Sequence, residues 1–489
     1  MNAPIRRVAF TIVAVFALLA LSATYLQAVA GQSYREDPRN ARLIAWRTGR
    51  ERGAIVTADS VVVARSDPDE EDPKLFQRTY PEGPAYVHTV GLTSVLFGST
   101  GLEEARSRDL ISDRDSTISG VLNALLGGDP RPRGLRLTLD HDLQSLAVDL
   151  LGDQRGAIVA LDPKTGAVLA MASTPGFDPN TLVGADAAPA GRALEEDPSE
   201  PLRDRTINSS YPPGSAFKVI TTAAALESGV ASPSTTFDDP VELELPGTTS
   251  TIRNFDGGVC NDGRSVSLAA AFIRSCNTTF AQLGMAVGAE QLVATAEAFG
   301  FNQPVPFDLD VLTSAIPAAA EFTDDPAAEA ANAIGQRDVQ ATPLQMAMVA
   351  AAVANDGELM VPYAVTDVFR SDGTIESTTR PTVWRRAASP ATAAVLQELM
   401  EQAVLSGTGQ RAAVPGIRIA GKTGTAEVTG QAPHLWFIGF GPVAAEPGER
   451  QIALAVVIES GGDAGESGTG GSVAAPMAAE LFKTFLGVG

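Results

Sequence analysis

Lysine is scarce in this chain, although basic side chains are not. Of the 36 lysine and arginine residues, five are lysines, namely Lys74, Lys164, Lys218, Lys422 and Lys483. Arginine stays protonated in proteins, whereas a desolvated lysine can lose its proton and then act as a base. A chain that otherwise uses arginine is therefore expected to need lysine chemistry where it keeps a lysine.

Histidine, cysteine and net positive charge are also in short supply. The 489 residues include three histidines (His88, His141 and His434) and two cysteines (Cys260 and Cys276). They show no ligand spacing, so we expect no metal ion and no other cofactor. The net charge is −22. A nucleic-acid-binding protein would normally need a basic surface, so nucleic acid is not an expected partner.

One uncharged run, from Val8 to Leu26, is long enough to cross a membrane, and no second run of that length follows. A helix over this run would span the ~30 Å hydrocarbon core. Arg6 and Arg7 precede it, which predicts a cytoplasmic tail over residues 1–7, an anchor over 8–30 and export of the remainder. A cleaved signal peptide is the alternative, but the apolar core of a signal peptide is usually shorter, about 7–15 residues.

The exported part is predicted to hold two domains. A proline- and arginine-containing linker at 129–134 separates a membrane-proximal segment, 31–134, from a larger domain, 135–489. In the first, 54–56 and 61–63 predict a hairpin. In the second we expect strands at 135–139, 156–161, 167–172, 417–420, 435–440 and 452–459, and helices at 142–151, 341–354 and 474–486. Strands at both ends with helices between them indicate an α+β domain with one sheet.

Ser215 and Lys218 form the first chemical motif. Pro212-Pro213-Gly214 is a turn, and 215–227 has helix-forming composition, so Ser215 is expected at a helix N-terminus. Free N–H groups there can stabilise a developing oxyanion. Residues three apart share a helix face, so Lys218 can take the Ser215 proton if its pKa is lowered. Alone the motif is weak, because a capping serine followed by an exposed lysine looks the same.

Ser275-Cys276-Asn277 is the second motif. Ser275 could relay a proton, and Asn277 could bind a substrate amide. The alternative is a helix N-cap before residues 278–287.

Lys422-Thr423-Gly424-Thr425 is the third motif and follows the expected strand 417–420. An edge strand there could pair with an extended peptide, Gly424 would let the substrate approach the backbone, and Lys422 would supply a fixed positive charge. Residues 164–166 repeat the Lys-Thr-Gly spelling, but between two strand-like runs, where a hairpin turn is expected.

Together the three motifs, in this order, are the signature of penicillin-binding proteins and class A β-lactamases. The chain resembles class B penicillin-binding proteins of the actinobacterial PbpA-like type over nearly its whole length. The residues that carry this resemblance, besides the motifs, are 52–55, 98–103, 137–140, 143–144, 174–180, 335–336, 342–347, 354–357 and 436–440.

The resemblance implies a peptidoglycan D,D-transpeptidase with an antiparallel sheet covered by helices, behind a small dimerisation or pedestal-like domain. Ser215 would attack the D-Ala–D-Ala bond of a stem peptide, with Lys218 as base, and an amine of a neighbouring stem would capture the acyl-enzyme. Ser275, Asn277 and Lys422 would handle protons and substrate. Thr423, Gly424 and Thr425 would bind the substrate, and the N–H groups of Ser215 and Thr425 would form the oxyanion hole. β-Lactams would acylate Ser215.

Several points stay open at this stage. A D,D-carboxypeptidase would differ only in using water as acceptor, and a catalytically idle scaffold is a further alternative. The membrane-proximal segment would position the catalytic domain over the glycan or bind a polytopic glycosyltransferase in the membrane. An oxidising compartment permits a disulfide between Cys260 and Cys276, which would brace the rim of the site, but two separate thiols are the alternative.

Overall fold

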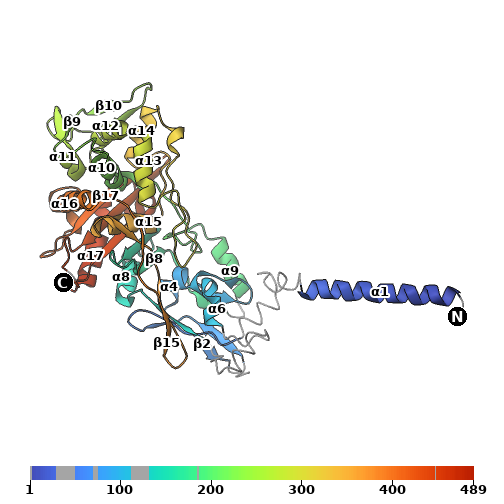
Figure 1. Cartoon of the computed structure of the whole chain (residues 1–489). Coiled ribbons are helices and arrows are strands. Elements are labelled where there is room, and N and C mark those ends of the chain that lie inside the picture. The colour runs from blue at the N-terminus through green and yellow to red at the C-terminus, as the bar shows by residue number, and fades with distance from the viewer. Residues whose placement is uncertain are drawn as a thin grey trace.

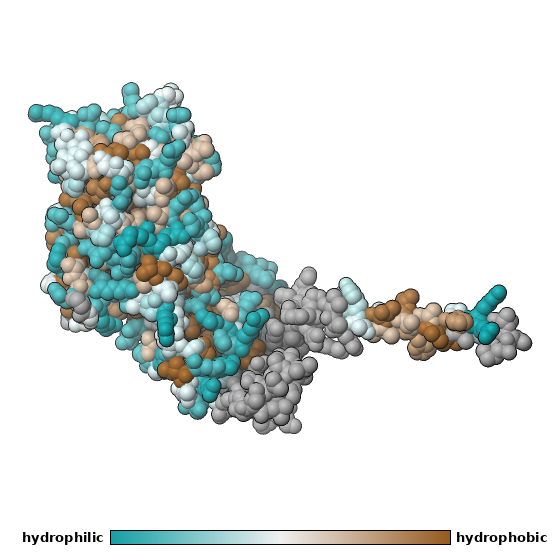
Figure 2. Space-filling view, in the orientation of Figure 1, coloured by the Kyte–Doolittle hydropathy of each residue, from teal (hydrophilic) through white to brown (hydrophobic). Residues whose placement is uncertain are grey.

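The computed structural model describes residues 3–28, 50–69, 75–111, 132–183, 187–446 and 448–488. It begins with the helix α1 (Ala3–Ala28), which stands apart from the remainder (Figure 1). Its apolar stretch, Arg6–Tyr25, is not buried within the protein, and Figure 2 shows it as a largely hydrophobic rod. α1 is long and apolar enough to cross a membrane, as the run from Val8 predicts; residues 29 and 30 of the expected anchor lie outside the described residues.

A five-stranded antiparallel sheet forms the centre of the larger domain, in the order β17-β18-β19-β7-β8. These strands are β7 (Gly156–Leu161), β8 (Val168–Thr174), β17 (Ala420–Val428), β18 (Gln431–Gly441) and β19 (Ile452–Ile458). The hairpin predicted around 164–166 is confirmed, because β7 pairs with β8. β17 lies at one edge, which leaves one side of its backbone free of a neighbouring strand.

Both faces of this sheet are covered by helices. On β7, Val159 belongs to one hydrophobic cluster and Ile158 to the other, as the alternation of side chains along a strand requires. The first face packs against α15 (Pro343–Ala354), in which every residue is buried, and the second against α8 (His141–Leu151) and α17 (Ala475–Leu486). α15 begins where the sequence predicts, because Thr342 caps it and Pro343 occupies its first turn.

A helical lobe lies beyond the β17 edge of the sheet, at the top of Figure 1. Its helices are α10 (Lys218–Glu227), α11 (Leu268–Arg274), α12 (Asn277–Val287), α13 (Ala289–Ala298), α14 (Pro326–Ala333) and α16 (Pro390–Ser406). Two small two-stranded antiparallel sheets flank them, β9 (Thr236–Asp238) with β12 (Ser265–Ser267) and the hairpin of β10 (Glu242–Glu244) with β11 (Thr251–Arg253). Sheet and lobe together confirm the expected α+β class.

The membrane-proximal part is built on a second sheet, in the order β15-β14-β6-β1-β2-β3. Its strands are β1 (Ile55–Val56), β2 (Val62–Pro68), β3 (Phe76–Thr79), β6 (Gly134–Leu137), β14 (Val365–Phe369) and β15 (Ile375–Thr378). The predicted hairpin at 54–63 is confirmed, since β1 pairs antiparallel with β2. The strand expected at 135–139 is instead Gly134–Leu137, and it joins this sheet, so the sheet takes strands from both sides of the expected boundary at 134.

Short helices pack beside this second sheet: α4 (Gly83–Val90), α5 (Gly101–Ala105) and α6 (Ser107–Leu110). Glu103 of α5 is fully buried, and its carboxylate accepts from the guanidinium groups of Arg52 and Arg78. Smaller elements elsewhere are β4 (Thr93–Ser94), β5 (Gly98–Ser99), α9 (Ala187–Glu195), β13 (Glu358–Met360) and β16 (Val383–Arg386).

Candidate active site

Ser215 lies on a tight turn in front of α10. Residues Gly214–Phe217 form one 3-10 turn, and the α-helix begins only at Lys218, three residues later than predicted. Such turns are frequent at helix N-termini, and in them the side chains three apart eclipse each other. Ser215 and Lys218 therefore share one side of the turn. Gly214 has a φ of 51°, and its N–H donates to Gly335 O at 2.9 Å, which fixes the entry to the turn.

Lys218 is fully buried beneath this turn. Its Nζ donates to Ser275 O and to Asn277 Oδ1, both at 2.8 Å. Burial, and then the charge of Lys422, lower its pKa well below the ordinary value for lysine. A neutral amine has two N–H donors and one lone pair, so these two bonds satisfy both donors and leave the lone pair to accept a proton.

Ser275, Cys276 and Asn277 form the sharp connection between α11 and α12. Ser275 has left-handed backbone angles (φ 65°, ψ 41°), an uncommon conformation for a residue with a side chain. This angle turns its carbonyl toward Lys218, while its hydroxyl accepts from Lys422 Nζ at 2.7 Å. The motif does stand at the N-terminus of α12, as its alternative interpretation holds, because Cys276 occupies the N-cap position. Cys276 makes no side-chain cap hydrogen bond, and Asn254 Oδ1 instead accepts from Asn277 N at 2.8 Å.

The two cysteines are joined in a disulfide, which decides between the alternatives left open by the sequence. Cys276 is buried within the second motif, and Cys260 lies on the loop that follows β11. Asp239 holds this loop, because its carboxylate accepts from Cys260 N at 2.7 Å. Arg274 in turn donates to Cys260 O. The bond thus ties the loop to the Ser275 connection.

The third motif lies within the strand β17 rather than after a strand, because β17 runs from Ala420 to Val428 and not from 417 to 420. Lys422 is fully buried, and burial lowers its pKa to about 7. The positive charge expected of Lys422 is therefore not fixed near neutral pH. Lys218 and Lys422 both contact Ser275, and two lysines with lowered pKa values beside this serine suit a site that moves protons.

Gly424 and the threonines beside it lie on opposite sides of β17. A Cβ at Gly424 would be 2.6 Å from Pro213 O and 3.2 Å from Ala216 N, so the strand packs directly against the turn that carries Ser215. Thr423 and Thr425 line the pocket on the other side. Thr423 Oγ1 is hydrogen-bonded to Thr408 Oγ1 at 2.6 Å.

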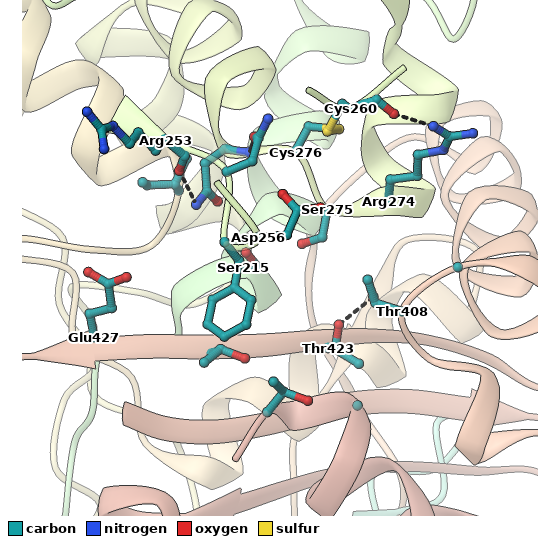
Figure 3. A pocket seen from close by; sticks show the side chains of 18 of the residues that line it. Ser215, Arg253, Asp256, Cys260, Arg274, Ser275, Cys276, Thr408, Thr423 and Glu427 are labelled. Atoms are coloured by element: carbon teal, nitrogen blue, oxygen red, sulfur yellow. Dashed lines mark hydrogen bonds between the residues drawn. A yellow bond between two sulfur atoms is a disulfide. The ribbon is translucent and has the colours of Figure 1, made fainter. Parts of the chain in front are cut away.

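A cavity of about 930 Å³ opens over these residues. Figure 3 shows Ser215 in its middle, Glu427 on one side, and Thr423 with Thr408 on the other. Ser215, Ser275, Asn277, Thr423 and Thr425 all line it, whereas Lys218 and Lys422 lie buried behind its wall. The structure therefore brings all three sequence motifs together.

Residues that sequence reasoning missed also belong to the site. Asn254, Thr408 and Glu427 line the cavity, and none lies in a motif that would have drawn attention to it. One sequence signal could have identified Glu427. It stands two residues after Thr425, and residues two apart on a strand face the same side. Among the described residues, no group of three histidine, cysteine, aspartate or glutamate side chains could hold a metal ion.

Two protein-family models match the chain. Residues 156–483 match the model for the penicillin binding protein transpeptidase domain, and residues 52–134 match that for the penicillin binding protein A dimerisation domain. The peptidoglycan D,D-transpeptidase PbpA of Mycolicibacterium smegmatis is 42% identical over 98% of this chain and 97% of its own length. The enzyme of the same name from Mycobacterium tuberculosis is 38% identical over 99% of both chains.

Solved structures give the same picture. The ceftriaxone acyl-enzyme complex of penicillin-binding protein A from M. tuberculosis matches with a TM-score of 0.83 and 38% identity, over 90% of this chain and 99% of that one. Its penicillin G acyl-enzyme complex matches with a TM-score of 0.80 and 38% identity, over 89% and 99%.

Proposed function

The chain belongs to the penicillin-binding protein transpeptidases, and we propose that this peptidoglycan D,D-transpeptidase uses Ser215 as its nucleophile and Lys218 as the base for acylation. The single observation that carries this assignment is the hydrogen-bonded arrangement of the three motifs. Lys218 Nζ bonds to the Ser275 carbonyl, and Lys422 Nζ bonds to the Ser275 hydroxyl.

Acylation would begin when the neutral Lys218 amine takes the proton of Ser215 Oγ. The oxygen attacks the carbonyl carbon of the D-Ala–D-Ala bond, and the N–H groups of Ser215 and Thr425 stabilise the oxyanion. The proton passes to the leaving nitrogen through Ser275 and Lys422, the C–N bond breaks, and D-alanine departs. Ser275 is suited to this relay because its hydroxyl accepts from Lys422 at 2.7 Å.

Substrate would lie along the free edge of β17. Thr423 and Thr425 face the pocket and would bind the terminal carboxylate with the help of Lys422. The side chain of Asn277 is held in place, because its Nδ2 donates to Arg253 O at 3.0 Å and its Oδ1 accepts from Lys218 at 2.8 Å. The second N–H of Nδ2 would then bind a substrate amide. Gly424 would allow the strand to remain close to Ser215 and to the bound peptide.

The test is covalent labelling of the full-length protein in detergent. We expect penicillin to add one acyl group at Ser215, identified by mass spectrometry of the peptide, and Ser215→Ala to take up none. A folded wild-type protein that takes up no label would instead support the idle scaffold. Release of the acyl group onto an added amine rather than onto water would distinguish the transpeptidase from the D,D-carboxypeptidase.

α1 is long and apolar enough to cross a membrane, and we propose that it anchors the chain there. Arg6 and Arg7 at its start favour a cytoplasmic N-terminus and a catalytic domain on the extracytoplasmic face. Protease added to intact cells should then degrade the catalytic domain.

We further propose domain limits of 31–134 and 135–489, with the membrane-proximal domain docking onto a polytopic glycosyltransferase during cell-wall growth. Crosslinking in membranes would test that contact.

A further inference from the structure

The active-site cavity carries opposite charges on its two sides. Figure 3 shows Arg274 on one side of Ser215 and Glu427 on the other. Both line the cavity. Arg253 lies on the same side as Glu427 in this view, but its guanidinium is paired with Glu242 at 2.7 Å. The side of Glu427 is thus left with an unneutralised carboxylate.

Glu427 lines the same pocket further along β17. Thr423, Thr425 and Glu427 all lie on this strand and all line the cavity, although the pairing of β17 with β18 shifts register between Ala426 and Val428. The step from Thr425 to Glu427 covers at most about 6.8 Å along the strand. Glu427 is exposed, and among the described residues its carboxylate has no hydrogen-bond or ion-pair partner.

The direction of the bound stem peptide follows from the proposed function, on which this inference rests. The proposed oxyanion hole places the scissile carbonyl at the N–H of Thr425, and the terminal carboxylate is bound by Thr423 and Thr425. With the carboxylate toward the Thr423 end, the peptide runs antiparallel to β17, and its upstream residues extend past Thr425 toward Glu427. Successive Cα atoms are 3.8 Å apart, so a long side chain on the residue before D-Ala–D-Ala reaches the Glu427 carboxylate.

The chemistry of that upstream side chain follows from the reaction itself. Transpeptidation ends with attack by an amine of a neighbouring stem, and donor and acceptor stems belong to the same polymer. Every stem therefore starts with an amine, which stays free until a cross-link acylates it. Alanine side chains carry none, so the amine must lie upstream of D-Ala–D-Ala, and the nearest position is the residue immediately before it.

We infer that Glu427 is a specificity-determining residue that pairs with the side-chain ammonium of the donor residue preceding D-Ala–D-Ala. It selects donor stems whose amine is still free over stems whose amine is already acylated in a cross-link. An exposed ion pair contributes up to about 1 kcal/mol, which corresponds to about fivefold in kcat/KM.

The experiment compares two donor peptides on the full-length protein in detergent: acetyl-lysyl-D-Ala-D-Ala with a free side-chain amine, and the same peptide with that amine acetylated. Release of D-alanine gives kcat/KM for each. We expect a free-to-acetylated ratio of about five for the wild type at low salt, falling toward one at 1 M salt, where the screening length is about 3 Å. Glu427→Gln should bring the ratio to about one, and Glu427→Lys should invert it.

Glu398→Gln is the matched control, because Glu398 is an exposed carboxylate on α16 outside the cavity; its ratio should stay at that of the wild type. Equal ratios in the wild type and Glu427→Gln, with both donors consumed, would overturn this inference alone. A ratio that falls in Asp256→Asn and not in Glu427→Gln would also overturn it, since Asp256 lines the same cavity. A wild-type protein that consumes neither donor and is not acylated by penicillin would overturn the proposed function as well.

Discussion

Replacement of Gly424 by alanine tests whether strand β17 positions the nucleophile. The added Cβ would be 2.6 Å from Pro213 O and 2.9 Å from the Cβ of Trp436. Pro213 O is a backbone atom of the turn that carries Ser215, so it cannot swing away as a side-chain end could. An ordinary contact to this Cβ begins at 3.4 Å. The strand and the turn would therefore have to move apart by about 0.8 Å to relieve the 2.6 Å contact.

Two magnitudes follow from this displacement. Overpacking of this kind costs about 1–3 kcal/mol of unfolding free energy. A misplacement near 1 Å at a catalytic group lowers the rate by about 100-fold. We therefore expect Gly424→Ala to remain folded but to be acylated by penicillin about 100-fold more slowly.

The assay is stopped-flow acylation by a fluorescent penicillin, with thermal unfolding measured on the same sample. Gly258→Ala is the control, because a Cβ there comes no closer than 3.6 Å to any other group, and it should behave as wild type. Acylation of Gly424→Ala at the wild-type rate, with unchanged unfolding, would refute the claim that this close packing positions Ser215.

Three further predictions concern single contacts of the site. Lys218→Met should slow acylation by about 10²–10⁴-fold, the contribution of a positioned base. In the wild type, burial and the nearby charge of Lys422 lower the pKa of Lys218 and so favour its neutral amine, and the acylation rate should fall as pH drops through that pKa; a pH–rate profile that stays flat in acid would contradict the base assignment. Thr408→Val loses the hydrogen bond to Thr423 and should slow acylation about 2- to 13-fold, whereas Thr408→Ser should restore it in the same assay. The double replacement of Cys260 and Cys276 by serine should lower the unfolding free energy by about 3 kcal/mol in denaturant titration, and an unchanged midpoint would show that the bond does not stabilise the fold.

Long, regular elements were predictable from the chain because their patterns are local. β7, β8 and α15 appear where alternation, turn residues and a Thr-Pro start indicate them. β17 was placed wrongly, since its Lys-Thr-Gly-Thr core lacks the apolar alternation of a half-buried strand. Gly424 is required there because a side chain would collide with Pro213 O, and strand propensity does not predict a glycine at this position.

The assignment of β6 shows a second limit of sequence reasoning. The sequence predicts a strand at 135–139 as the start of the second domain, directly after the linker at 129–134, whereas the strand observed is Gly134–Leu137. It pairs instead with β1 in parallel and with β14 in antiparallel orientation. These partners lie about 80 residues before it and 230 residues after it in the chain. Strand pairing depends on which edges meet in space, and the local sequence does not record that.

The sequence by itself determined the chemical groups of the site. Ser215 with Lys218, Ser275 with Asn277, and Lys422 with its threonines were recognisable because side-chain chemistry and short spacing are written in the chain. Only the tertiary structure decided how these groups act on one another. It set the left-handed backbone of Ser275, the burial that lowers the pKa of both lysines, and the cavity side to which Glu427 belongs. Desolvation and hydrogen bonding depend on distances between segments that are remote in sequence, and folding alone sets those distances.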